Sequence, residues 1–309
     1  MLSSDLGFQR APRAAFPRLC ALLFSAFLAP PVSAQQTPGA VPQSPGAVPQ
    51  SPGAVPQTPG AVPQTPGVVP QSPGAVLYAA MQRIEAANGS HFWIDRTEVS
   101  IGQYRRFQQA TGYRSLAERE GGGFEWGAGW TRRPGWFWHA PYGSPGADDE
   151  PAVHLNWSEA RQYCQWAGKR LPTDAEWMRA AYTETRERPP EGFVRFTRYP
   201  YPTGNTADGA NHRDAPGAPG RHQAVGRSKA GVNGLYDMGA NVWEWVDSGA
   251  GSEQLTRGGS WWYGPAPMHH DHRALKPADF YVVYIGWRCA ADRPPPIAGS
   301  PAQQRQGAG

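Results

Sequence analysis

The sequence lacks the features of several large classes of protein. Its formal net charge is only +4 and no run of basic residues is longer than a pair, so we expect no nucleic acid among its partners. The apolar stretch at residues 19–28 has about ten residues, too few for a bilayer-spanning helix, so we expect no integral membrane protein. A nucleophile elbow, a phosphate-binding glycine loop and an H-E-x-x-H zinc motif are all absent.

The N-terminus has the pattern of a secretory signal peptide. Arg10, Arg13 and Arg18 precede the apolar stretch, and the small residues V-S-A ending at Ala34 are of the kind that signal peptidase recognises. We therefore predict a signal peptide at residues 1–34 and an exported protein, either periplasmic or secreted. The alternative is an N-terminal membrane anchor, for which the apolar run is short.

Proline and glycine are concentrated after this segment. Residues 35–77 repeat the heptapeptide Q-[ST]-P-G-A-V-P about six times, and the proline in every unit forbids a coiled coil. This composition predicts an extended, solvated spacer. The remaining residues 78–292 are enough for one hydrophobic core, so we predict a single domain there and a disordered tail at residues 293–309.

Local patterns within the domain indicate an α+β fold. Residues 91–98 alternate apolar and polar side chains as a half-buried strand does. The segments S-I-G-Q at residues 100–103 and T-D-A-E at residues 173–176 are capping boxes that begin helices. Helical spacing predicts a further helix at residues 158–167 with Cys164 on its buried side. The later part of the domain is rich in glycine, proline, asparagine and aspartate, which favours long loops.

Five segments, in this order, resemble the formylglycine-generating-enzyme (sulfatase-modifying-factor) family. They are HFWIDRTEVSIGQYRRF, PAVHLNWSEARQYCQWAGKRLPTDAEWMRAA, GLYDMGANVWEWV, RGGSW and IGWRCA. The resemblance covers nearly the whole domain and implies a loop-rich variant of the C-type lectin fold. The family includes oxidising enzymes, periplasmic proteins of siderophore maturation and binding proteins without a reaction, so it does not by itself choose an activity.

Signal-peptide cleavage would leave two cysteines, Cys164 and Cys289, in an oxidising compartment. In the enzymes that the chain resembles, cysteines at the matching positions form a disulfide. We therefore predict that Cys164 and Cys289 are joined, with two free or reactive thiols as the alternative.

Two segments resemble the calcium loops of the family, because calcium prefers oxygen ligands from carboxylates, amides and main-chain carbonyls. The first is N-V-W-E at residues 241–244, and the second is N-H-R-D at residues 211–214. The predicted calcium-site residues are Asn241, Val242 and Glu244 in the first and Asn211, His212 and Asp214 in the second. The alternative for the first segment is that its asparagine and glutamate bind main-chain groups without a metal.

The family's copper-dependent members carry two cysteines after R-G-G-S that bind Cu(I) through thiolates. Here the corresponding positions fall near Tyr263 and Met268, and residues 257–288 contain no cysteine. The resemblance therefore predicts that this chain is not a copper-dependent formylglycine generator.

Histidines occupy the segment where the thiolates are missing. If this segment is extended, His270 and His272 share a face while His269 points the opposite way. We expect His270 and His272 to bind a transition metal, with Asp271 as a supporting carboxylate. The alternative is a polar loop that lines a groove. His270 and His272 are therefore catalytic candidates. By resemblance, Ser260 and Arg288 are candidates too, although the serine and the arginine also suit purely structural roles.

Two functions remain open at this stage. The first is a periplasmic oxidoreductase that acts on an exported small molecule or peptide. The second is a non-catalytic, lectin-like module that binds a small molecule, peptide or glycan in its groove, at the end of the Pro-rich spacer.

Overall fold

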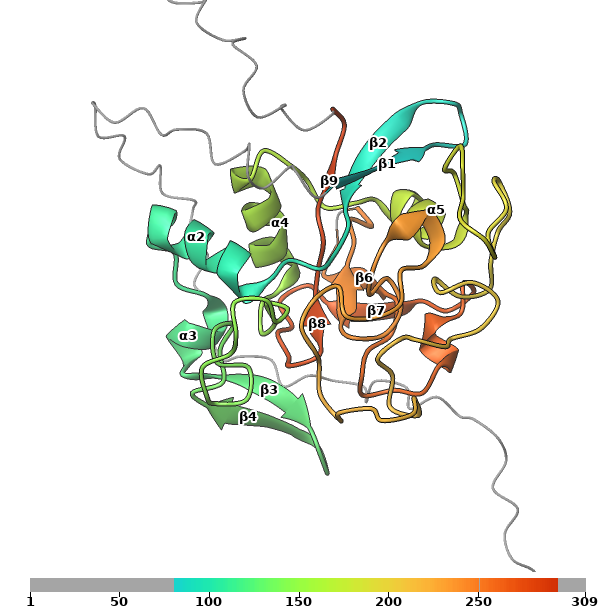
Figure 1. Cartoon of the computed structure of the whole chain (residues 1–309). Helices are drawn as coiled ribbons and strands as arrows, with labels where there is room; N and C mark the ends of the chain where they lie inside the picture. Colours follow the sequence, from blue (N-terminus) through green and yellow to red (C-terminus); the bar gives the residue numbers. More distant parts are fainter. Residues whose placement is uncertain (1–80, 250, 294–309) are drawn as a thin grey trace, which may run out of the picture. The chain divides into compact units, whose positions relative to one another are not determined.

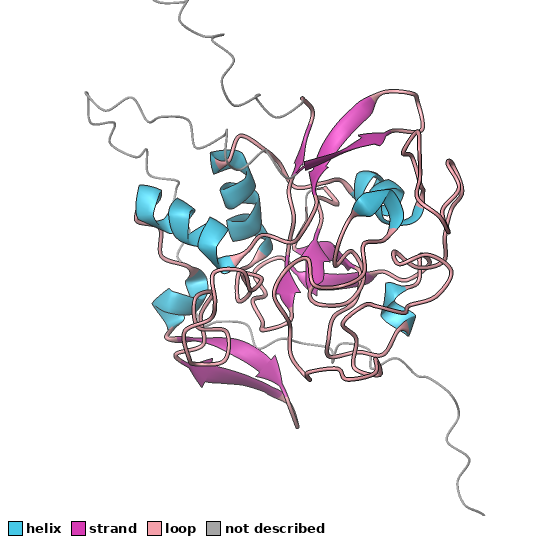
Figure 2. Cartoon of the chain, viewed as in Figure 1, coloured by secondary structure: helices cyan, strands magenta, loops and turns pink. Residues whose placement is uncertain are grey.

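The computed structural model describes residues 81–249 and 251–293. The predicted signal peptide, the Pro-rich spacer and the tail from residue 294 lie outside them. No helix within the two described ranges is both long and apolar enough to cross a bilayer. Long loops join the helices and short strands, as Figure 2 shows, so the predicted loop-rich α+β class is confirmed.

Capping boxes begin the α-helices of these ranges. The helices are α2 (Ile101–Thr111), α3 (Leu116–Glu120), α4 (Trp157–Trp166) and α5 (Asp174–Tyr182). In each, the side chain before the helix accepts a hydrogen bond from the backbone three residues later, and the side chain there accepts one in return. The boxes of α2 and α5 are the predicted ones. The helix predicted at residues 158–167 is α4, which begins and ends one residue earlier.

The first and last described strands lie in one sheet (Figure 1). The strands β1 (Met81–Glu85) and β2 (His91–Asp95) form an antiparallel hairpin, and β9 (Ala290–Ala291) pairs antiparallel with β2. The strand predicted at residues 91–98 is therefore confirmed over its first five residues. This pairing joins the beginning and the end of the domain.

A second sheet carries the segments of functional interest. Its strand order is β7–β6–β5–β8, with β5 and β8 parallel and the other neighbours antiparallel. The strands are β5 (Trp243–Trp245), β6 (Glu253–Arg257), β7 (Ala274–Pro277) and β8 (Ile285–Gly286), and a separate hairpin consists of β3 (Gly122–Trp126) and β4 (Trp130–Pro134). The G-G-S turn and the histidines lie in the connection from β6 to β7, next to the strand that contains Glu244.

Aromatic side chains dominate the core. Trp177, Trp243, Trp245 and Trp287 are among its largest fully buried side chains. The predicted disulfide between Cys164 and Cys289 is confirmed, with the two Cα atoms 5.7 Å apart. It joins α4 to the chain just before β9, so it attaches the helical part of the domain to the sheet that contains both ends.

Candidate functional site

The turn after β6 requires glycine at two successive positions. Gly258 and Gly259 have φ values of 92° and 77°, in the left-handed region that other residues rarely adopt. A Cβ atom on Gly258 would lie 2.6 Å from the carbonyl oxygen of Met238. Ser260, one of the catalytic candidates, is buried, and its hydroxyl accepts a 3.4 Å hydrogen bond from the backbone of Trp262. This hydrogen bond from the backbone two residues later is typical of a serine in a turn.

The two positions of the family's copper-binding cysteines are filled by packed side chains. The ring of Tyr263 lies 5.7 Å from that of Trp243 and 6.1 Å from that of Tyr284, and burial raises the pKa of its hydroxyl. Met268 is fully buried, and its carbonyl oxygen accepts a hydrogen bond of 2.9 Å from the hydroxyl of Tyr182. Neither residue offers a thiolate.

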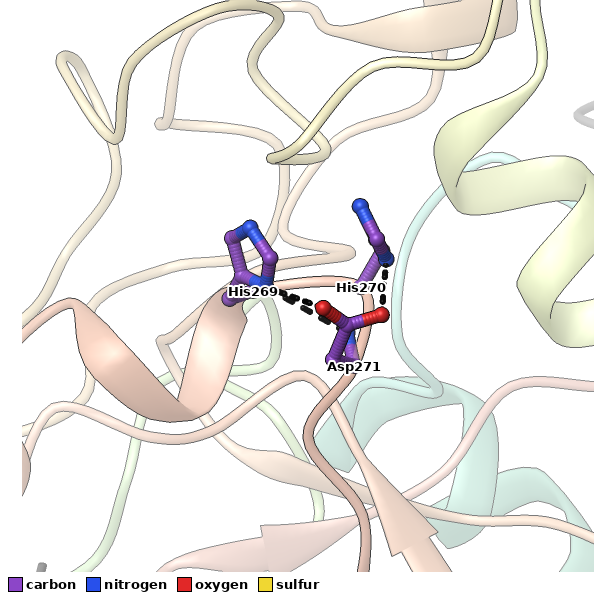
Figure 3. A group of neighbouring side chains, drawn as sticks. All are labelled: His269, His270 and Asp271. Atoms are coloured by element: carbon purple, nitrogen blue, oxygen red, sulfur yellow. Dashed lines mark hydrogen bonds and ion pairs between the residues drawn. The ribbon is translucent and has the colours of Figure 1, made fainter.

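The histidines form a compact turn rather than the extended segment expected from the sequence. The short 3-10 helix η2 (Ala266–Met268) precedes the turn, and His269 and His270 lie on either side of the carboxylate of Asp271 (Figure 3). The Nδ1 atom of His270 is 2.6 Å from one carboxylate oxygen, and that of His269 is 3.5 Å from the other. One potential ligand atom from each residue lies within 4.8 Å of the others.

His272 does not join this group, so its predicted pairing with His270 on one face of an extended segment is wrong. Its ring lies 5.6 Å from that of Trp243, and its carbonyl accepts a hydrogen bond from Arg257. Burial, with Lys276 and Arg257 nearby, lowers the pKa of this imidazole and keeps it neutral near pH 7. In an extended segment His269 would point away from His270, but the turn brings the two rings to a centroid distance of 4.3 Å.

The histidine turn is partly open to solvent. The exposed fractions of the His269, His270 and Asp271 side chains are 36%, 23% and 73%. A guanidinium nitrogen of Arg198 lies 3.1 Å from the Nδ1 atom of His270. Tyr201 packs beside His269, with ring centroids 5.5 Å apart. Two imidazoles and a carboxylate suit divalent iron, copper or zinc, and ligands on three consecutive residues leave coordination positions open.

Arg288, the fourth catalytic candidate, is fully buried and bound to Glu244. Its guanidinium donates hydrogen bonds of 2.8 and 2.7 Å to the two carboxylate oxygens of Glu244. The indole of Trp177 donates to the same carboxylate at 2.7 Å. Glu244 is therefore held by a cation and an indole N–H, and Arg288 stands inside the fold rather than at an open surface.

The two calcium-like segments meet at their asparagines. The Nδ2 atom of Asn211 lies 3.0 Å from the Oδ1 atom of Asn241. The side chain of Asn241 and the backbone of Val242 also donate to the two oxygens of Glu98, at 2.7 and 3.1 Å. Asn241 therefore links the two segments to a carboxylate from a distant part of the sequence.

Glu98 belongs to a buried acidic region that the sequence reasoning missed. Burial raises its pKa, with further contributions from Asp237 and Glu244, while Arg288 opposes the shift. Burial also raises the pKa of Asp237. Glu98 stands at the end of the alternating segment at residues 91–98, where its position resembled that of an ordinary strand residue.

The remaining calcium candidates, His212 and Asp214, differ in exposure. His212 is buried, and burial lowers its pKa. Asp214 is exposed and pairs with its neighbour Arg213 at 2.9 Å, which lowers the pKa of its carboxyl group. Calcium binding at either segment stays a prediction.

Residues 52–293 match the sulfatase-modifying factor enzyme 1-like domain family. The chain belongs to this family. It is 31% identical over 259 residues to the formylglycine-generating enzyme of Thermomonospora curvata, an alignment that covers 66% of this chain and 82% of that relative. It is 29% identical over 251 residues to a hercynine oxygenase of Mycolicibacterium thermoresistibile, with 67% of this chain and 54% of that protein covered.

Solved structures with a similar fold include Treponema denticola variable protein 1, at 18% identity and a TM-score of 0.48. The similarity covers 69% of this chain and 95% of that one. The family match together with the mixed, loop-rich architecture confirms the predicted formylglycine-generating-enzyme variant of the C-type lectin fold.

Proposed function

We propose that this family member is an exported oxidoreductase whose reaction takes place at a transition metal bound by His269, His270 and Asp271. The observation that supports the proposal is the convergence of two imidazole nitrogens and a carboxylate on one partly open turn. The turn follows the R-G-G-S segment, as the copper-binding cysteines do in the enzymes that the chain resembles. The hercynine oxygenase relative adds support for oxygen-dependent chemistry in this family.

The backbone of the turn is held in place before any metal binds. The amide of His269 donates to the carbonyl of Ala266 at 3.1 Å, and that of His270 donates to the carbonyl of Pro200 at 3.0 Å. The carbonyl of Met268 accepts from Tyr182. A ligand set on a fixed backbone loses less conformational freedom when a metal binds than one on a free loop does.

The simplest balanced reaction is a two-electron oxidation with dioxygen as the acceptor, SH2 + O2 → S + H2O2. Two electrons and two protons leave the substrate, and dioxygen is reduced to hydrogen peroxide without a further reductant. A bound redox-active metal would supply the electron transfer between substrate and dioxygen. The carboxylate of Asp271 would offset part of the metal's positive charge.

Metal content and oxygen consumption test the proposal. Mature wild-type protein purified without chelator should contain about one equivalent of iron or copper, and a His269→Ala/His270→Ala variant should lose nearly all of it. His91→Ala is a matched control because His91 is an exposed histidine of β2 and is not part of the histidine turn. Equal metal content in wild type and the double variant would overturn the proposed site.

A non-catalytic binding module is the second candidate. The packing of Tyr263 and Met268 in place of the two thiolates favours it, because the reactive pair of the related enzymes is replaced by buried side chains. In that case, metal-loaded protein would consume no oxygen with any small molecule or peptide that it binds. Export through the predicted signal peptide belongs to both candidates, and mass spectrometry of the native protein should find an N-terminus near residue 35.

A further inference from the structure

We infer that residues 192–198 form a substrate-binding edge beside His270 and select a carboxylate attached to an aromatic or other apolar group. The inference rests on the proposed metal site and names the class of substrate that this site would take. It depends on one arginine, on the charge around the histidine turn and on two apolar side chains held at the surface.

Arg198 is an exposed cation without a carboxylate partner among the described residues. Arg195 on the same loop pairs with Glu85 at 2.9 Å, whereas Arg198 lies 3.1 Å from the imidazole of His270. The Nδ1 atom of His270 accepts from Arg198 only in the tautomer in which it does not donate to the carboxylate of Asp271, which lies 2.6 Å from the same atom. If the same nitrogen binds a metal, its lone pair is used, and the guanidinium becomes available to another acceptor.

The charges around the turn favour an anion as that acceptor. A divalent metal and Arg198 together bring three positive charges, and Asp271 offsets one of them. The partly buried position of His270 reduces screening by water, so an anionic group between the metal and the guanidinium would be stabilised. A carboxylate also matches the planar, two-donor geometry of a guanidinium.

The same loop presents apolar side chains to solvent. Val194 and Phe196 are 63% and 53% exposed, and they are two of the three exposed large hydrophobic side chains in the described residues. The third, Leu275, lies in β7 shortly after the histidine turn. Isolated exposed apolar side chains are common, but two of them on the loop whose Arg198 contacts His270 suit a substrate with an apolar body.

Phe196 also has an unusual backbone. Its φ of 64° lies in the left-handed region, which is strained for a bulky residue. The guanidinium of Arg195 lies 4.5 Å from its ring centroid, and the carbonyl of Glu184 accepts a hydrogen bond from its amide. These contacts hold the ring at the surface, and strained residues of this kind occur preferentially at ligand-binding sites.

Binding of two matched probes tests the inference. Titration calorimetry on the full mature protein would compare N-acetylphenylalanine, which carries the carboxylate, with its uncharged amide. We expect wild type to bind the carboxylate about tenfold more tightly, as one charge-assisted hydrogen-bond pair provides. Arg198→Gln should abolish this preference, and Arg105→Gln, which removes a partly exposed arginine of α2 outside the loop, should keep it. Phe196→Ala should weaken the binding of both probes by the same factor.

The outcomes separate this inference from the proposed function. Equal binding of the two probes by metal-loaded wild type, or a preference that persists in Arg198→Gln, would overturn the inference and leave the metal site standing. Wild type could purify without metal and still prefer the carboxylate probe, with that preference lost in Arg198→Gln. This result would overturn the oxidoreductase proposal and support the binding edge. The metal content of Arg198→Gln should equal that of wild type, which excludes a collapsed turn as the cause of lost binding.

Discussion

Replacement of Arg288 by methionine should destabilise the fold severely, because it leaves a buried carboxylate without its cation. The side chains of Arg288 and Glu244 are both 0% exposed and share two hydrogen bonds. Arg288 also donates to the carbonyl oxygens of Asp95 and Tyr236, at 3.0 and 2.8 Å. Methionine fills similar space but donates no hydrogen bond.

The expected loss in the free energy of unfolding is about 4–5 kcal/mol, at the upper end of the range for breaking a buried ion pair. Trp177 remains as a donor to Glu244, which limits the loss. Glu98 and Asp237, however, place further acidic groups near the vacated guanidinium. For a domain of this size, a loss of this magnitude corresponds to a decrease in Tm of about 8–20 °C.

Urea unfolding of the mature chain at pH 7, followed by tryptophan fluorescence, measures this loss. Arg105→Met is the matched control, because Arg105 and its partner Asp148 are 39% and 72% exposed, and it should cost less than about 1 kcal/mol. The double variant Arg288→Met/Glu244→Gln should recover part of the stability by removing the unpaired charge. A loss below about 1 kcal/mol for Arg288→Met would refute the reasoning.

Four further outcomes are expected. Calcium at a hundredfold excess over its Kd should stabilise wild type by about 2.7 kcal/mol but not Asn241→Ala, and identical melting curves in EDTA and calcium would contradict the predicted site. Reduction of the disulfide between Cys164 and Cys289 should lower the free energy of unfolding by up to about 5 kcal/mol, as urea unfolding with and without reductant would measure. Because burial raises the pKa of Glu98 above 4.5, its protonated form favours the folded state, so the free energy of unfolding should fall as pH rises from that value towards neutrality. Urea unfolding across this pH range should show a smaller decrease in the free energy of unfolding for Glu98→Gln than for wild type. Equal decreases in the two proteins would count against Glu98 as the cause. Mass spectrometry of a sulfatase-type cysteine peptide incubated with wild type and copper should detect no formylglycine.

Short-range patterns were enough to predict much of the scaffold. A capping box needs only two side chains three residues apart, so the starts of α2 and α5 could be read directly from the sequence. The pairing of Cys164 with Cys289 followed from the presence of only two cysteines outside the predicted signal peptide and from the family resemblance. The absence of cysteine from residues 257–288 likewise determined that no thiolate pair is available there.

The constellation of side chains at the site depended on tertiary structure. In an extended segment side chains alternate between two faces, which predicts that His270 and His272 share one face. The chain instead turns after η2 and brings His269 to His270. Whether a short polar segment is extended or turned depends on distant partners, here the carbonyl of Pro200 and the hydroxyl of Tyr182.

Long-range contacts also decided the roles of the buried charges. Glu98 lies more than a hundred positions before Asn241 in the sequence, yet it accepts a hydrogen bond from that side chain. Arg288 meets Glu244 because β8 pairs parallel with β5. The sequence by itself determined where helices begin, since caps follow from interactions among near neighbours. Only the tertiary structure decided which charges and imidazoles meet, because such contacts form when the burial of the aromatic core brings remote segments together.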